Sequence, residues 1–172
     1  AAVLLQSNIK FNGAVLLQIQ SQGAVRLAVV EVQPDLAYRA TANLGAPVGQ
    51  ATDFADLFNA QAAGRCAITL DPLDRQPGQQ PYQGVVSLVD GDGEPLSSLS
   101  GVLEQYMLQS EQLDTTLVLA ADDQVAAGLL IQRLPMEGEH NLAGKQPASD
   151  EDDPLEHYRR ISMLTRSLTR DE

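Results

Sequence analysis

The first third of the chain alternates apolar and polar positions, a pattern typical of half-buried β-strands. In the clearest run, Val15, Leu17 and Ile19 take every second position. Asn12-Gly13 predicts a hairpin turn after a short strand at 9–11, because Asn and Gly both tolerate positive φ. Further strands are predicted at 25–32 and 36–42. Together these segments predict a meander of antiparallel strands.

Helical periodicity appears first in the middle of the chain. A short helix is predicted at 53–58, capped by Thr52 or Asp53, and a longer one at 96–112. The longer helix has one apolar stripe, made of Leu99, Val102, Leu103, Tyr106 and Leu113. Strands are predicted at 66–70, 83–89, 116–120 and 127–134, the last two forming a hairpin around Asp122-Asp123.

The C-terminal part divides into a polar stretch and a helix. Residues 137–153 are polar and end in an acidic run, so they predict a linker between a core at 1–136 and a helix at 154–172. Pro154 suits the first position of that helix. Its apolar stripe is predicted to pack on the core or on a partner chain, and gives the candidate client or partner contacts: Leu155, Tyr158, Ile161, Leu164 and Leu168. Runs of strands with a few covering helices predict a single-domain α+β fold with antiparallel or mixed sheets.

Charge narrows the possible partners. The chain has 172 residues, 11 of them basic and 23 acidic, for a net charge of −12. Nucleic acids and anionic membranes are therefore poor partners. No apolar run of 18 residues is present to span a membrane. Residues 1–5 lack a basic segment, so we expect them to be the end of a buried helix in a fragment of a longer protein, and not a signal peptide.

Candidate chemistry is sparse. The one cysteine, Cys66, lies in a strand-like run and is expected to be a buried, structural thiol. Asp90, Asp92 and Glu94 superficially resemble a calcium loop, but the Glu that an EF-hand loop needs at its twelfth position is Gly101 here, which favours a plain acidic turn. His140 and His157 have no second ligand at metal-binding spacing. The residues contain no catalytic constellation, and by themselves they indicate a binding module.

Five segments, in order, resemble the redox-regulated chaperone family of heat-shock protein 33. They lie at 9–13, 26–30, 82–86, 103–113 and 127–135. The most specific is Leu103-Glu104-Gln105-Tyr106 followed by Ser110-Glu111-Gln112-Leu113. The family-motif residues named from these segments are Tyr82, Gly84, Tyr106, Ser110, Glu111 and Gln112.

The resemblance implies a stress-response holdase of the bacterial cytoplasm. Such a chaperone binds unfolded client proteins without ATP, forms a homodimer and is not an enzyme. Its redox switch is a C-terminal zinc domain with a Cys-x-Cys and a Cys-x-x-Cys pair. We expect this chain to end before that domain and to need no cofactor, since Cys66 matches none of those ligands.

Two other functions remain open from the residues alone. One is a structural oligomerisation domain, which would have a large apolar interface and no affinity for unfolded proteins. The other is a metal-using enzyme built on Asp90, Asp92 and Glu94, which would show a bound divalent ion or a deep polar pocket at that turn.

Overall fold

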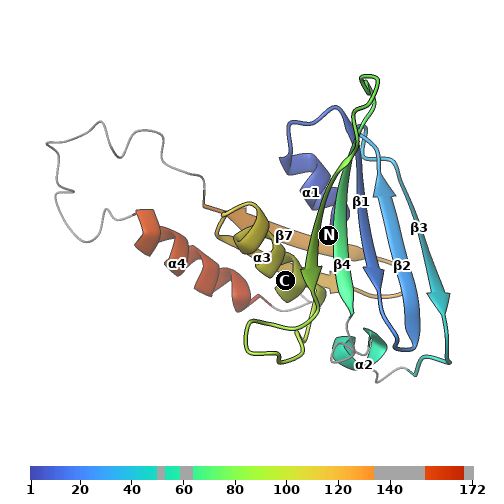
Figure 1. The fold of residues 1–172 in the computed structure, drawn as a ribbon. Helices are drawn as coiled ribbons and strands as arrows, with labels where there is room; N and C mark the ends of the chain where they lie inside the picture. Colours follow the sequence, from blue (N-terminus) through green and yellow to red (C-terminus); the bar gives the residue numbers. More distant parts are fainter. Residues whose placement is uncertain (50–52, 59–63, 134–153, 169–172) are drawn as a thin grey trace, which may run out of the picture. The chain divides into compact units, whose positions relative to one another are not determined.

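The order of strands and helices follows the order of the apolar patterns along the chain. The structure, a computed structural model, describes residues 1–49, 53–58, 64–133 and 154–168. Its elements are α1 (Ala2–Asn8), β1 (Gly13–Gln20), β2 (Val25–Val32), β3 (Tyr38–Leu44), α2 (Phe54–Phe58), β4 (Arg65–Pro72), β5 (Tyr82–Ser87), α3 (Leu99–Ser110), β6 (Thr115–Ala121), β7 (Ala126–Gln132) and α4 (Pro154–Arg166) (Figure 1). The predicted α+β class is confirmed. None of the helices in the described ranges is long and apolar enough to cross a membrane. The predicted linker at 137–153 lies outside the described residues.

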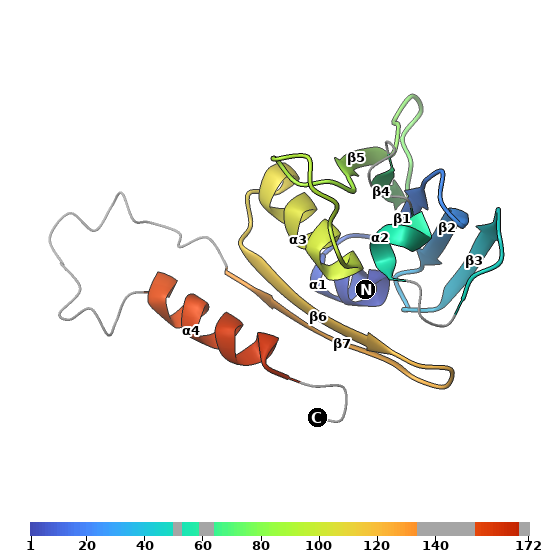
Figure 2. The ribbon, with the colours of Figure 1, turned by 90° about the horizontal axis from the view of Figure 1, so that it is seen from below.

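The chain divides into two compact units, residues 1–106 and residues 107–172, each with most of its contacts inside itself. In the first unit, five antiparallel strands form a sheet in the order β3-β2-β1-β4-β5. In register, Leu17 of β1 lies opposite Val30 of β2 and Ile68 of β4. Because side chains alternate between the two faces of a strand, these three residues share one face. Figure 2 shows α1, α2 and the start of α3 on one side of this sheet.

The alternation predicted for β1 is confirmed. Val15, Leu17 and Ile19 are buried, while the intervening Leu16 and Gln18 are partly exposed. Burial of such aliphatic side chains stabilises a fold by about 1.5–3 kcal/mol each. The inward face of β1 therefore forms the centre of this unit's core.

The predicted hairpin at Asn12-Gly13 is wrong. Residues before it belong to α1, which ends at Asn8, and β1 begins at Gly13. Gly13 is needed for a different reason, since a Cβ there would collide with the carbonyl oxygen of Asp71 and with the ring of Phe11. The glycine permits β1 and β4 to approach each other where Gly13 pairs with Pro72. The short strand predicted at 9–11 is also absent, because these residues form the connection between α1 and β1.

The central helix is shorter at both ends than predicted. Its N-terminus is set by Ser98, whose hydroxyl accepts a hydrogen bond from the N–H of Gly101 at 3.1 Å. At the C-terminus, Gln112 has a φ of 57°, and the N–H of Leu113 donates to the carbonyl of Met107 at 3.0 Å. This left-handed residue with a bond back across the last turn is a common way to end a helix.

The second unit contains the hairpin of β6 and β7 and the helix α4. The predicted hairpin around Asp122-Asp123 is confirmed, with the Asp122 carboxylate accepting the N–H groups of Gln124 and Val125, both at 2.7 Å. Helix α4 packs on β6 through hydroxyl groups. The Thr116 hydroxyl lies 3.1 Å from that of Tyr158 and donates to that of Ser162 at 3.0 Å.

An apolar groove on the sheet as the candidate functional site

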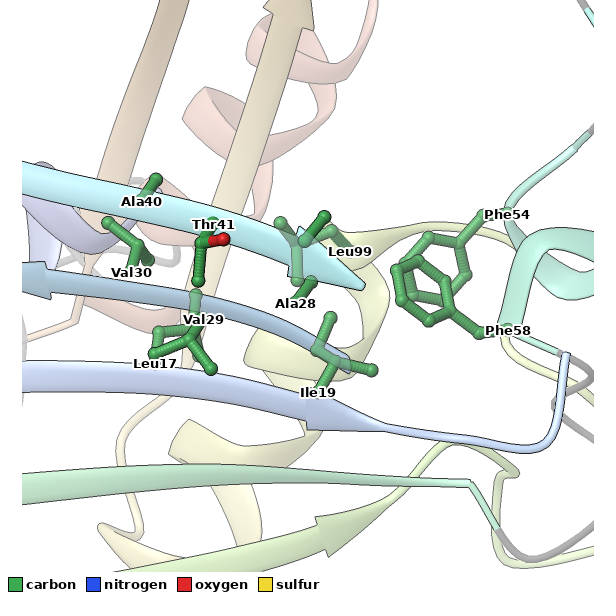
Figure 3. Close-up of a pocket in the computed structure, with 11 residues that line it drawn as sticks. Leu17, Ile19, Ala28, Val29, Val30, Ala40, Thr41, Phe54, Phe58 and Leu99 are labelled. Atoms are coloured by element: carbon green, nitrogen blue, oxygen red, sulfur yellow. The ribbon is translucent and has the colours of Figure 1, made fainter. Parts of the chain in front are cut away.

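An apolar groove lies within the first unit, between the sheet and helices α2 and α3 (Figure 3). Its volume is about 550 Å³. It is lined by Leu17, Ile19, Ala28, Val29, Val30, Ala40, Thr41, Ala42, Phe54, Phe58 and Leu99. The volume is within the range of about 300–1,000 Å³ that is usual for ligand-binding pockets.

The groove arises because the helical cover stops part of the way across the sheet. Leu17 and Ile19 of β1 are buried, Ala28 of β2 is partly exposed, and Ala40 and Ala42 of β3 are exposed. The same sheet face therefore passes from core to open surface within three strands. Because the alanine side chains of β2 and β3 are small, they leave space above this face of the sheet.

Two phenylalanines line the groove from α2. Phe54 and Phe58 are four residues apart and so lie on one face of this short helix. Their ring centroids are 4.9 Å apart with an interplanar angle of 46°. Figure 3 shows both rings on the side of the groove where Ile19 and Leu99 lie.

The groove is suited to hold apolar side chains and not to catalyse a reaction. None of the described residues that line it is charged, and Thr41 supplies the one polar side chain among them. Transfer of apolar surface from water stabilises a complex by about 25 cal/mol per Å². The arrangement is that of a binding surface.

The predicted contact residues on α4 are divided by the structure. Leu155 and Tyr158 are partly buried, on the side where Ser162 and Thr165 are buried. The other three, Ile161, Leu164 and Leu168, are exposed in the single chain, Leu164 by 63%. Burial of that exposed stripe against a partner stays a prediction.

Two of the family-motif residues meet in the structure. The ring of buried Tyr106, on α3, lies directly over Gly84 of β5, so close that a Cβ on Gly84 would be 2.5 Å from the ring carbon Cε2. Tyr82, two residues earlier, is half exposed. Ser110 is the last residue of α3, and Glu111 and Gln112 directly follow it. These motif residues therefore lie where α3 packs and where it ends.

In the acidic turn after β5, the first carboxylate accepts hydrogen bonds from the backbone of the same turn. The Asp90 side chain accepts the N–H groups of Asp92 and Glu94, both at 2.9 Å. Gly93 takes a φ of 86°, a conformation that glycine adopts easily. These are the features of a tight polar turn.

The described residues do not fit the zinc site that the family resemblance implies. Across 1–49, 53–58, 64–133 and 154–168, no group of three or more His, Cys, Asp or Glu side chains could hold a metal ion. A structural zinc site takes four ligands, most often Cys and His. Cys66 is buried in β4, His157 lies on α4, and His140 is outside the described residues. We assign no zinc ligand in this part of the chain.

Cys66 is buried, as predicted, and burial raises the pKa of its thiol to about 12. We expect a thiol reagent to label it slowly at neutral pH, because the reactive thiolate is scarce and the sulfur is covered. The measurement is the labelling rate of the native chain against that of the chain in urea. A matched control is a Cys66→Ala, Ala126→Cys chain, whose thiol would lie at an exposed position of β7 and should react quickly. Equal rates for native and control chains would contradict a structural role for Cys66.

Sequence reasoning missed the groove. The alternation in β1 correctly identified its inward residues, but nothing in it indicated how far the helices extend over them. One signal was present in the small inward residues Ala28, Ala40 and Ala42, which leave space above the sheet.

The comparisons with known proteins agree with the resemblance seen in the sequence. The family model described as Hsp33 protein matches residues 1–172. Two curated relatives are each named 33 kDa chaperonin. The one from Chromobacterium violaceum is 41% identical, with 100% of this chain and 50% of the relative covered. The one from Neisseria meningitidis is 38% identical, with 100% and 49% covered. These names are those of chaperones and not of enzymes.

A solved structure has a similar fold. The crystal structure of the 33 kDa chaperonin from Thermotoga maritima, a heat shock protein 33 homolog, matches with a TM-score of 0.55 and 18% identity. The match covers 76% of this chain and 44% of that one. This chain spans about half the length of the two curated relatives.

Proposed function

Because the chain belongs to the Hsp33 family, we propose that it forms the core of an ATP-independent holdase chaperone, which binds unfolded proteins in the apolar groove and prevents their aggregation. The observation that carries the proposal is the open groove, in which a sheet face with a buried β1 continues as exposed alanines on β3. A holdase needs accessible apolar surface and no chemistry. The net charge of −12 helps to keep such a protein soluble.

The proposal extends to the setting in which the chain works. We place it in the bacterial cytoplasm as a stress-response protein that needs no cofactor, and we propose a homodimer for which the exposed stripe of α4 is the candidate contact. In the full-length family member, redox control would come from the zinc domain. The buried Cys66 supports the expectation that oxidants change the activity of this chain little.

The test is the aggregation of a heat-denatured enzyme, followed by light scattering, with the chain added and without ATP. We expect suppression both with and without peroxide. The informative variant is Ala42→Gln, which places a polar amide over the groove floor. We expect it to raise the concentration needed for half suppression about fivefold or more, because an amide that loses water without gaining a partner costs on the order of 1–3 kcal/mol.

The matched control is Asn43→Gln. Asn43 is exposed on the same strand but points to the opposite face of the sheet, so this variant should behave as the parent chain does. No suppression at molar excess by the parent chain would contradict the proposal and favour a structural oligomerisation domain. An equal loss of aggregation suppression in both variants would indicate that clients bind to a surface other than the groove.

A further inference from the structure

The outer strand of the sheet, β3, has one edge that no described strand covers. In the order β3-β2-β1-β4-β5, it pairs with β2 alone, and all seven of its residues are exposed (Figure 1). Edge strands that avoid further pairing often carry lysine or proline. β3 has neither, and its one charged side chain, Arg39, is paired with Glu31 of β2. The edge is therefore open to a further strand.

The hydrogen-bond pattern shows which backbone groups point outward from this edge. Where β2 turns into β3, the N–H of Gln33 donates to the carbonyl of Ala37 at 2.8 Å. In an antiparallel ladder, opposite residues are hydrogen-bonded to each other at every second position. Counting on from this pair along the register, every second residue of β3 turns its N–H and C=O away from β2. These residues are Tyr38, Ala40 and Ala42.

The outward backbone groups belong to residues on the groove side of the sheet. Ala40 lies opposite Val30 of β2, and Val30 lies opposite Leu17 of β1, so these residues share one face. Ala40 and Ala42 both line the groove. A strand added at this edge would therefore place half of its side chains on the face that contains the groove.

The other edge of the sheet, on β5, does not combine these features. The N–H of Leu88 donates to the carbonyl of Gly64 at 3.1 Å, and the same counting shows that Val85 turns its backbone groups outward. Val85 lies opposite Ala67, and Ala67 lies opposite Gln18, so its side chain is on the sheet face away from the groove.

We propose that an unfolded client adds to β3 as an antiparallel strand and places every second side chain in the groove. This inference rests on the proposed function and adds the class of client, which is an extended segment with alternating apolar residues. In strand addition, main-chain hydrogen bonds supply affinity and pockets for alternate side chains supply selectivity. The antiparallel direction follows the rest of the sheet, in which every strand pair is antiparallel.

Charge and volume favour a client over a second copy of this chain at the edge. Each chain carries −12, so two copies that paired along β3 would repel each other. The groove beside the edge has a volume of about 550 Å³. β3 of a second copy would bring Ala40 and Ala42, which are too small to fill it, whereas a client can bring leucine or phenylalanine.

The experiment measures fluorescence anisotropy of three labelled peptides with the parent chain. All three have the same alternating leucine and serine sequence. One is unmodified, one is N-methylated on its leucines and one is N-methylated on its serines. In an antiparallel pair, the peptide residues that share the face of Ala40 and Ala42 turn their backbone groups toward β3. Methyl groups on the leucine nitrogens therefore block the pairing, and those on the serine nitrogens point away from it.

We expect methylation of the leucines to raise the Kd about tenfold or more, because the hydrogen bonds to the β3 carbonyls are lost. Methylation of the serines should leave the Kd nearly unchanged. The two methylated peptides have equal composition, so binding through apolar contact alone would not distinguish them.

Ala40→Pro tests the edge from the side of the protein. Proline is tolerated on an edge strand where the N–H faces outward, so pairing of β3 with β2 should be retained. The unmodified peptide should bind about fivefold or more weakly, because one outward donor is replaced by a ring. Val85→Pro makes the matching change on the edge of β5 and should bind as the parent chain does. Urea unfolding checks that both variants fold, and the comparison of the methylated peptides does not depend on them.

The outcomes separate this inference from the proposed function. Equal binding of the two methylated peptides, weakened by Ala42→Gln, would overturn strand addition and leave the groove as the client site. Equal binding together with a dimer that Ala40→Pro dissociates would assign the edge to a second copy and also overturn it. Absence of binding for every peptide would overturn both the strand addition and the proposed function.

Discussion

Replacing Leu103 by alanine is expected to lower the free energy of unfolding by about 2–5 kcal/mol, the usual cost of truncating a fully buried leucine. Leu103 lies on α3 with none of its surface exposed. Its loss removes apolar contacts and leaves a cavity that the surrounding side chains fill only in part. For a chain of this size, each kcal/mol lowers the melting temperature by about 2–4 °C.

The same helix supplies the control for this experiment. Leu108 is 57% exposed, so Leu108→Ala makes the identical chemical change with little lost burial and should alter stability by about 0.5 kcal/mol or less. Both variants are measured by urea unfolding followed by circular dichroism. Equal destabilisation by the two substitutions would mean that the burial of a leucine on α3 does not determine how much it contributes to the free energy of unfolding.

Replacing Gly84 by alanine is expected to destabilise the fold by about 1–3 kcal/mol, the usual cost of overpacking a core. The added methyl group would lie 2.5 Å from the ring of Tyr106, which is only 3% exposed. A buried ring has little room to move away, so α3 and β5 would have to separate. Urea unfolding of the variant measures the effect.

Two further variants identify the cause. Gly91→Ala is a matched glycine control, because no atom lies within 4 Å of the position that its Cβ would take. It should leave stability nearly unchanged. Tyr106→Leu should cost less in the G84A background than in the parent chain, since removing the ring also removes the clash. Additive effects of the two substitutions would mean that the destabilisation by G84A does not come from a clash with the Tyr106 ring.

The local elements of this protein were largely predictable because each has its own periodic signal. The alternation of Val15, Leu17 and Ile19 correctly gave the inward face of β1. The stripe of Val102, Leu103 and Tyr106 correctly gave the buried face of α3. Periodicity works here because both faces are set by residues close together in the chain.

The structure corrects one local signal whose meaning depends on a distant partner. Asn12-Gly13 has the composition of a hairpin, yet Gly13 serves the close approach of Asp71, a residue far along the chain. On α4, Ile161 and Leu164 are exposed in the single chain, because the helix turns Ser162 and Thr165 towards its buried side. Burial of the exposed stripe against a partner stays a prediction. Local composition does not indicate which surface a helix will meet.

The sequence by itself determined the α+β class, the family, the acidic charge and the inward face of β1. These depend on composition and on short-range periodicity, which a single chain displays directly. Only the tertiary structure decided where the sheet loses its helical cover. The groove exists because β3 pairs at the edge of the sheet and α2 brings Phe54 and Phe58 to one side of a floor of small alanines. Both conditions depend on contacts between segments distant in sequence.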